Sequence, residues 1–139
     1  MSTFKDADEL YQYMGKMFEM AVNDPQFVEA TKDGDLVVKL NYSNPDSTLL
    51  IDFPGRMVKM GADAEAVTDP TVSLRMTADD GHKFWLGKLN FTLAMAQRKV
   101  KMEGSAAKAL KLLPLTKPLF ASYERLLRES GRDDLLGAS

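Results

Sequence analysis

Five short segments of the sequence alternate between apolar and polar residues, and no other feature constrains the fold as strongly. Alternation places every second side chain on the same face of a strand, so each segment is predicted to be a strand with one buried face. The SNPD sequence at 43–46 is typical of a turn and joins the first two strands into a hairpin. The pattern therefore predicts a mostly antiparallel sheet with one solvated face. The segments are 35–42, 47–53, 56–61, 71–76 and 99–103, and their predicted inward residues include Leu36, Val38, Leu40, Tyr42, Leu49, Ile51, Phe53, Val58, Met60, Val72, Leu74 and Met76.

Helical spacing of apolar residues and capping residues predict the helices between and around these strands. The first is an amphipathic helix over 3–22, in which Asp6 and Glu9 have the spacing of a capping box. The others are a short helix after Asp24, a helix from Thr77 to Gly87, a short helix after Asn90, one from Ser105 to Pro114, and one from Thr116 to Gly131. The chain is thus predicted to be an α+β protein.

The end of the chain is predicted to turn a corner. Pro114 and Pro118 bracket the entry to the terminal helix, so we expect two helices joined by a stiff bend. The terminal helix has one apolar stripe that includes Tyr123 and Leu127. We expect this helix to cover an apolar opening as a lid, and the alternative that stays open is a helix docked permanently in the core. The polar tail, about 131–139, is expected to fray.

Length and charge restrict the class of protein. A chain of 139 residues fits a single domain, 1–139, that buries enough surface to fold without disulfides, and it contains no cysteine. The formal net charge of −2 offers no broad basic field for nucleic acid. The sequence shows neither the apolar core of a signal peptide nor an apolar run long enough to span a bilayer, although transient membrane contact stays open. We therefore expect a cytoplasmic protein.

No residue pattern indicates catalysis, a metal site or a cofactor. His82 is the only histidine; it lies beside charged residues at a helix start and is expected to be on the surface in water. The carboxylates of Asp79 and Asp80 are explained by the N-terminal end of the same helix. The DGD sequence at 33–35 lacks the later ligands of a calcium loop and is read as a turn. The basic RKVK sequence at 98–101 is read as the outer face of a strand.

Apolar residues give the positive signal. The chain has nine methionines, and those spread over the predicted strands and the helix facing them include Met57, Met60, Met76, Met95 and Met102; alanines flank the fifth strand at 94, 96, 106, 107 and 109. Methionine adapts to irregular shapes, and small side chains among large ones allow either close packing or a cavity. Periodicity leaves both alternatives open.

The order of these elements and two motifs resemble the sterol carrier protein type 2 family. The first motif is the small-residue helix, basic strand and Ala/Leu helix in AMAQRKVKMEGSAAKALKLLP, residues 94–114. The second is DPTVSLRMTADDGHKFWLGKLN, residues 69–90, in which a strand leads into a helix with aromatic residues. The resemblance covers about residues 5–125.

This resemblance implies a curved five-stranded sheet with helices on one face, enclosing an apolar tunnel. It further implies non-catalytic binding and transfer of lipids such as sterols, fatty acids or fatty acyl-CoA. An alternative is an accessory subunit that presents a hydrophobic intermediate, for example a quinone precursor, to enzymes; the oligomeric state stays open. The residues expected to line the tunnel, rather than fill a solid core, are Phe84, Trp85, Phe91, Leu93, Met95, Leu110, Leu113, Leu119 and Phe120.

Overall fold

Five strands form one sheet in the order β3-β2-β1-β4-β5 in the computed structural model, which describes residues 3–32 and 34–137. Strand β1 lies at the centre, antiparallel to β2 and parallel to β4, and the remaining pairs are antiparallel. The predicted mostly antiparallel sheet is confirmed, with one parallel pair at its centre. The strands are β1 (Val37–Ser43), β2 (Ser47–Asp52), β3 (Met57–Met60), β4 (Val72–Thr77) and β5 (Lys101–Gly104).

The register places the predicted inward residues on one face. Leu40 lies between Leu49 on β2 and Leu74 on β4, and Val38 lies between Ile51 and Val72. These side chains are buried or packed against the core. The alternation of the sequence therefore identified the core face correctly along all four of the strands β1 to β4.

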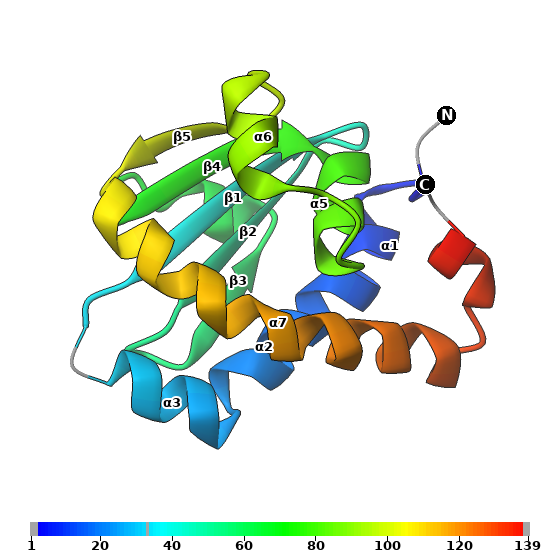
Figure 1. The fold of residues 1–139 in the computed structure, drawn as a ribbon, viewed down its shortest axis with the longest axis horizontal. Coiled ribbons are helices and arrows are strands. Elements are labelled where there is room, and N and C mark those ends of the chain that lie inside the picture. The colour runs from blue at the N-terminus through cyan, green and yellow to red at the C-terminus, as the bar shows by residue number, and fades with distance from the viewer. Residues whose placement is uncertain (1–2, 33, 138–139) are drawn as a thin grey trace.

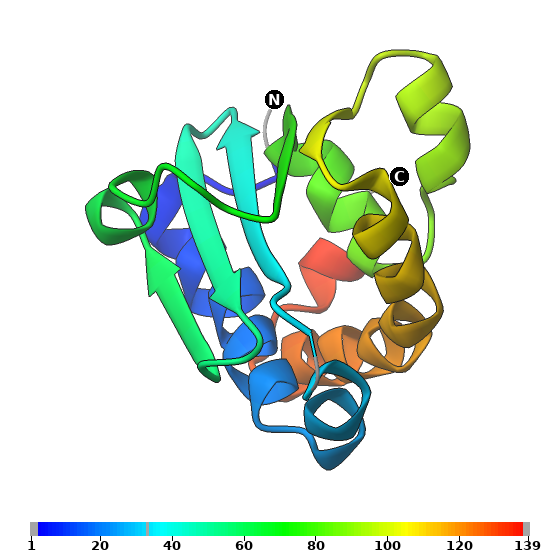
Figure 2. The same ribbon diagram turned by 90° about the vertical axis from the view of Figure 1, so that its left-hand side faces the viewer.

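Most helices cover this inner face, as Figure 2 shows. The predicted caps are confirmed: the Asp24, Thr77, Asn90 and Ser105 side chains each accept a hydrogen bond from a backbone N–H in the first turn of the helix that follows. The helices are α1 (Ala7–Leu10), the π-helical turn η1 (Tyr11–Gly15), α2 (Lys16–Val22), α3 (Pro25–Thr31), α4 (Ala62–Glu65), α5 (Ala78–Trp85), α6 (Phe91–Ala96), α7 (Ala106–Glu129) and the 3₁₀-helix η2 (Asp133–Gly137).

The outer face of the sheet is not wholly solvated, which corrects the prediction. Helix α4, absent from the sequence prediction, packs on β2 and β3 and contributes to burying Thr48 and Leu50. The Lys39 ammonium donates to the backbone carbonyls of Glu65 and Val67 and so holds this segment on the sheet. The Ala/Asp/Glu sequence of α4 has too little apolar periodicity to predict its docking.

The predicted corner between two terminal helices is wrong, because α7 runs unbroken through Pro114 and Pro118. Each proline removes one helical hydrogen bond, from the carbonyls of Leu110 and Pro114. Both prolines and Leu110 are exposed, so water can reach this side of the helix and pair with those carbonyls. The helix crosses the whole molecule in Figure 1.

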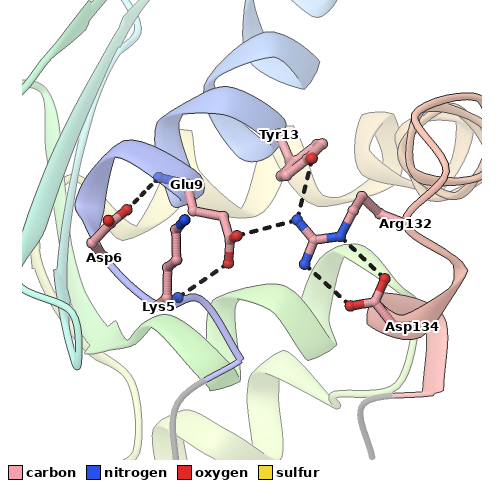
Figure 3. Close-up of polar contacts among 6 residues, drawn as sticks. All are labelled: Lys5, Asp6, Glu9, Tyr13, Arg132 and Asp134. Carbon is pink, nitrogen blue, oxygen red and sulfur yellow. Dashed lines mark hydrogen bonds and ion pairs between the residues drawn. The ribbon is translucent and has the colours of Figure 1, made fainter.

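The polar tail packs on the N-terminal helix, contrary to the expected fraying; residues 138 and 139 lie outside the described part. Arg132 donates to Glu9 at 3.1 Å, to the Tyr13 hydroxyl at 3.2 Å and to both carboxylate oxygens of Asp134 (Figure 3). Leu135 is 3% exposed. The two ends of the described chain therefore hold each other in place.

Candidate functional site

An apolar cavity lies between the inner face of the sheet and the helices α2, α3, α5, α6 and α7. The side chains around it are apolar apart from the hydroxyl of Thr116 and the indole N–H of Trp85. The lining residues are Phe18, Phe27, Val38, Leu40, Ile51, Phe53, Val72, Leu74, Phe84, Trp85, Phe91, Ala109, Leu112, Leu113, Thr116 and Leu119.

Alternation along the strands and helical spacing along α7 together place the lining residues around the cavity. Residues at alternate positions of β1 and β4 form the floor of the cavity. On α7 the spacing of three and four residues brings Ala109, Leu112, Thr116 and Leu119 to the same side of the helix. Gly104 allows the chain to turn from β5 into α7, since its φ is +99° and a Cβ there would meet the backbone of Thr71.

Aromatic rings form the wall beside α5 and α6. The ring of Phe84 meets those of Trp85, Phe91 and Phe120 edge to face, at centroid distances of 4.8, 5.7 and 5.6 Å. Phe18 from α2 meets Trp85 in the same manner at 5.1 Å. Such pairs favour defined ring positions, so this wall is ordered although its members come from four helices.

The cavity offers no unpaired polar group. The Thr116 hydroxyl donates to the Leu113 carbonyl at 2.6 Å. The hydroxyl of Tyr42, buried behind Trp85, has a raised pKa because of its burial, and a hydrogen bond with Trp85 acts in the opposite direction. No acidic or basic side chain is among the described lining residues. The cavity can therefore hold hydrocarbon, and its wall supplies no acid or base.

The cavity is small, at about 60 Å³. An engineered cavity that binds benzene has about 150 Å³, and pockets for drug-sized ligands have about 300–1,000 Å³. Side chains around it must therefore move before a lipid chain can enter.

Five of the nine predicted tunnel residues lie around this cavity: Phe84, Trp85, Phe91, Leu113 and Leu119. The other four do not. Leu93 and Leu110 are 53% and 55% exposed, whereas Met95 and Phe120 are partly buried and pack on the core.

Sequence reasoning did not assign the floor and the far wall to the cavity. The inward strand residues were predicted to be buried, but alternation cannot distinguish a residue beside a cavity from one in a solid core. Phe27 and Phe53 stack at a centroid distance of 5.9 Å, and both belong to the lining. Only the arrangement of the sheet against α7 shows which buried residues surround the cavity.

His82 is 0% exposed, which corrects its predicted place on the surface. It belongs to the buried side of α5 with Ala78, Gly81 and Trp85, a helical spacing that was overlooked. One ring nitrogen, Nε2, lies 2.8 Å from the Leu135 carbonyl and must donate to it, so Nδ1 accepts from the Tyr123 hydroxyl at 2.7 Å.

This histidine links three parts of the chain and lies outside the cavity lining. Its ring meets the ring of Phe4 edge to face at 5.2 Å. Burial lowers the pKa of His82, the hydrogen bond to Leu135 raises it, and Asp79 and Lys88 act in opposite directions. His82 is therefore a buried structural residue that ties α5 to α7 and to the C-terminal segment.

The described residues contain no group of three His, Asp or Glu side chains placed to hold a metal ion. None of the helices in the described ranges is long and apolar enough to cross a membrane.

Comparison with protein families gives one match, to the SCP-2 sterol transfer family, over residues 2–117. None of the curated protein sequences matches the chain significantly.

Several solved structures share the fold. The sterol carrier protein domain 2 of Helicoverpa armigera is 23% identical, with a TM-score of 0.61 over 81% of this chain and 88% of that one. Aedes aegypti sterol carrier protein 2, in complex with the C16 fatty acid palmitate, is 20% identical, with a TM-score of 0.55 over 80% and 94%. The ubiquinone synthesis protein UbiJ-SCP2 is 12% identical, with a TM-score of 0.56 over 81% and 89%. At these identities the likeness concerns the fold.

Proposed function

The chain belongs to the SCP-2 sterol transfer family, and we propose that it binds the apolar part of a lipid in the cavity beneath α7 and transfers it without chemical change. The observation that carries this proposal is the lining itself, which is apolar except for the Thr116 hydroxyl and the Trp85 indole N–H, and both of these are already hydrogen-bonded. A carrier of this kind recognises shape and hydrophobicity, and it needs no acid, base or cofactor.

The ligand that suits this lining best is a flexible alkyl chain. A polar headgroup inside the cavity would find no partner, and an unpaired polar group in an apolar site is costly. The headgroup of a fatty acid or fatty acyl-CoA would therefore stay at the surface. A rigid sterol would require a larger displacement of side chains than a chain that enters one methylene at a time.

Entry requires movement of the wall, and the first half of α7 is the part built to move. It supplies Ala109, Leu112 and Leu113 to the cavity and contains both prolines. Missing helical hydrogen bonds lower the cost of bending a helix at this place. The opening is thus assigned to the first half of α7, and not to the terminal segment that the sequence suggested as a lid.

The energetics suit a carrier that must release its ligand. Burying a methylene contributes about 0.8 kcal/mol, so a dozen give about 10 kcal/mol. Lost translational and rotational freedom costs several kcal/mol at least, and opening the wall adds to this cost. An affinity on the order of micromolar follows.

The residues proposed to contact the ligand are the five predicted ones around the cavity, Phe84, Trp85, Phe91, Leu113 and Leu119. Phe120 is proposed to act indirectly, because its ring contacts Phe84 and holds that wall.

The experiment that tests this proposal fills the cavity. Ala109→Leu adds three carbon atoms to the lining, and overpacking of this kind costs about 1–3 kcal/mol. We expect a fluorescent fatty acid to bind about tenfold more weakly to the variant. The matched control is Ala107→Leu, an exposed position on the same helix, which should bind as the wild type does. Equal binding by both variants would contradict the site.

The alternative is an accessory subunit that presents a hydrophobic intermediate to an enzyme. It is favoured by one observation, the shared fold with the ubiquinone synthesis protein UbiJ-SCP2. Native mass spectrometry after mild purification separates the two functions. A carrier should retain a mixture of lipids, whereas an accessory subunit should retain a single intermediate or a protein partner.

A further inference from the structure

Charge is distributed unevenly along the chain. Residues 83–123 contain eight lysines and arginines and a single acidic residue, Glu103, whereas the rest of the chain contains ten basic and nineteen acidic residues. The formal charges of the two parts are therefore +7 and −9, which the net charge of −2 conceals. The basic part includes α6, β5 and the first half of α7.

These elements lie on one side of the molecule. Figure 2 shows α6 and the first turns of α7 together on the side opposite β2 and β3. Both helices contribute to the cavity wall, through Phe91 on α6 and through Ala109 and Leu112 on α7. The basic part of the chain thus covers the cavity.

The outward side of the first half of α7 is unusual for a surface helix. Five exposed residues lie on this side, and each has another of them three or four positions away: Ala107, Leu110, Lys111, Pro114 and Lys117. Between Ala106 and Tyr123 this helix carries three lysines and no acidic residue. Its exposed surface is therefore apolar and cationic only.

The nearby helix α6 adds a second exposed leucine. Leu93 and Leu110 are more exposed than any other large apolar side chain described in the structure, at 53% and 55%. Arg98 and Lys99 follow α6 directly and are exposed as well. Two exposed leucines and the exposed cationic residues of the same elements thus belong to the side of the molecule that covers the cavity.

We propose that this surface, here called the basic face and defined by Leu93, Arg98, Lys99, Leu110, Lys111 and Lys117, docks on an anionic lipid bilayer. Cationic side chains are attracted to anionic headgroups, and leucines gain by entering the interface between headgroups and acyl chains. The acidic remainder of the chain is repelled by the same surface, so the field of the whole protein turns the basic face toward the membrane.

Docking through the basic face would bring the wall of the cavity to the membrane surface. Leu110 is flanked on α7 by cavity residues, and Leu112 lines both the cavity and a groove of about 380 Å³ between α3 and α7 that also contains Lys108 and Lys111. A docked molecule would hold the movable wall of its cavity against the bilayer. A lipid chain could then pass between the two without crossing water.

Flotation with vesicles tests the proposal and does not depend on the protein having a bound ligand. The protein is mixed with vesicles of phosphatidylcholine alone or with about one third phosphatidylglycerol. We expect binding to the anionic vesicles only, and weaker binding as salt rises, since salt screens the attraction. Equal binding to both vesicles, or to neither, would overturn the proposal, and capture by nucleic acid or an acidic protein instead would not rescue it.

Two double variants locate the docking surface. The ammonium groups of Lys111 and Lys117 take part in none of the ion pairs among the described residues, and each lysine at an anionic surface contributes roughly a fivefold gain. Lys111→Gln/Lys117→Gln should therefore bind roughly 25-fold more weakly. The control Lys5→Gln/Lys16→Gln has the same net charge, removes exposed lysines outside the basic face, and should lose much less. Equal losses in the two would contradict the assignment.

The leucines and the fatty acid supply the remaining readouts. Leu93→Gln/Leu110→Gln should keep its melting temperature, because both side chains are exposed, and should lose the binding that persists at high salt. In the absence of vesicles, all three variants should bind fluorescent fatty acid as the wild type does. Failure of vesicle binding with intact fatty-acid binding overturns the docking proposal alone, whereas absent fatty-acid binding in the wild type overturns the proposed function.

Discussion

The first half of α7, Ala106–Pro118, and its second half, Leu119–Glu129, belong to one continuous helix but differ in what surrounds them. The first half contains both prolines, exposes Leu110 and borders the cavity. The second half buries Tyr123 and Leu127 completely, and Tyr123 is hydrogen-bonded to His82.

The two halves of α7 would thus serve two different needs of the proposed lipid carrier, a stable fold and an entrance for the ligand. The fold needs a stable attachment, which the second half provides through buried side chains and the His82 hydrogen bonds. The proposed ligand entry needs a wall that opens at low cost, and we assign it to the first half because this half lacks two helical hydrogen bonds and lies over the cavity. A single helix can meet both needs because its second half is fixed by buried side chains, whereas its first half is exposed on one side and borders the cavity on the other.

Removing the second half should have the largest effect. A chain that ends at Leu115 lacks the second half, the last three residues of the first half and the tail, and it loses the buried side chains of Leu119, Tyr123 and Leu127. Each such loss costs about 2–5 kcal/mol, and together they approach or exceed the whole stability of a small protein, about 5–15 kcal/mol. We expect no cooperative thermal transition by circular dichroism.

A point variant provides the matched comparison. Leu127→Ala should lower the free energy of unfolding by about 2–5 kcal/mol, whereas Leu110→Ala on the first half should change it by less than about 0.5 kcal/mol. A truncated chain that melts cooperatively would show that the second half is a lid and not part of the core.

The attachment of the second half should depend on pH through His82. Burial lowers the pKa of His82 below its ordinary value of 6.5. The unfolded chain then binds a proton that the folded chain does not, so stability is lost as the pH falls through 6.5 toward the lower, folded value. Between about pH 7.5 and pH 5.5 the loss should reach at most about 1.4 kcal/mol.

Urea denaturation of His82→Gln provides the control for this pH dependence. The variant should be less stable than the wild type at neutral pH, because the buried hydrogen bonds are replaced imperfectly. Its stability should nevertheless change less over the same pH range. An identical pH dependence in both proteins would assign the titration to another group.

Pro114→Ala tests the first half of α7, because it should make this half harder to bend. Alanine restores an N–H that can pair with the Leu110 carbonyl, which stiffens the first half by about 1 kcal/mol. We expect slower exchange of a bound fluorescent fatty acid in stopped-flow measurements, by about fivefold. Faster or unchanged exchange would place the moving wall elsewhere.

The smallest effect is expected at the C-terminal contact in Figure 3. Arg132→Gln removes the ion pair with Glu9, whose side chain is largely buried, and the stacking over Tyr13. Because the guanidinium is partly exposed, we expect a loss of about 1 kcal/mol, which should be smaller in high salt. A loss as large as that of Leu127→Ala would show that the tail, rather than the second half of α7, holds the molecule together.

Most of the fold could be predicted from the sequence because alternation and capping are local signals. The inward residues of β1 and β2 and the caps Asp24, Thr77 and Asn90 were predicted correctly. Helix α4 was missed because its attachment depends on Lys39, 26 residues away from Glu65 in sequence.

The errors share a physical cause, which is tertiary context. Two prolines predict a bend, but their exposed side lets water replace the lost hydrogen bonds and the helix continues. Charged neighbours suggested a solvated His82, but the side of α5 that carries it is covered by Phe4 and Tyr123. The exposure of Leu93 and Leu110 likewise depends on packing that spacing alone does not reveal.

Hydrogen–deuterium exchange along α7, with and without palmitic acid, tests the central claim most directly. We predict that the amides of residues 109–113 and 115–117 exchange faster than those of 121–128 in the free protein, and that saturating fatty acid slows exchange only in the first group. Uniform exchange along the helix, or an equal slowing of both groups, would contradict a movable wall joined to a fixed attachment.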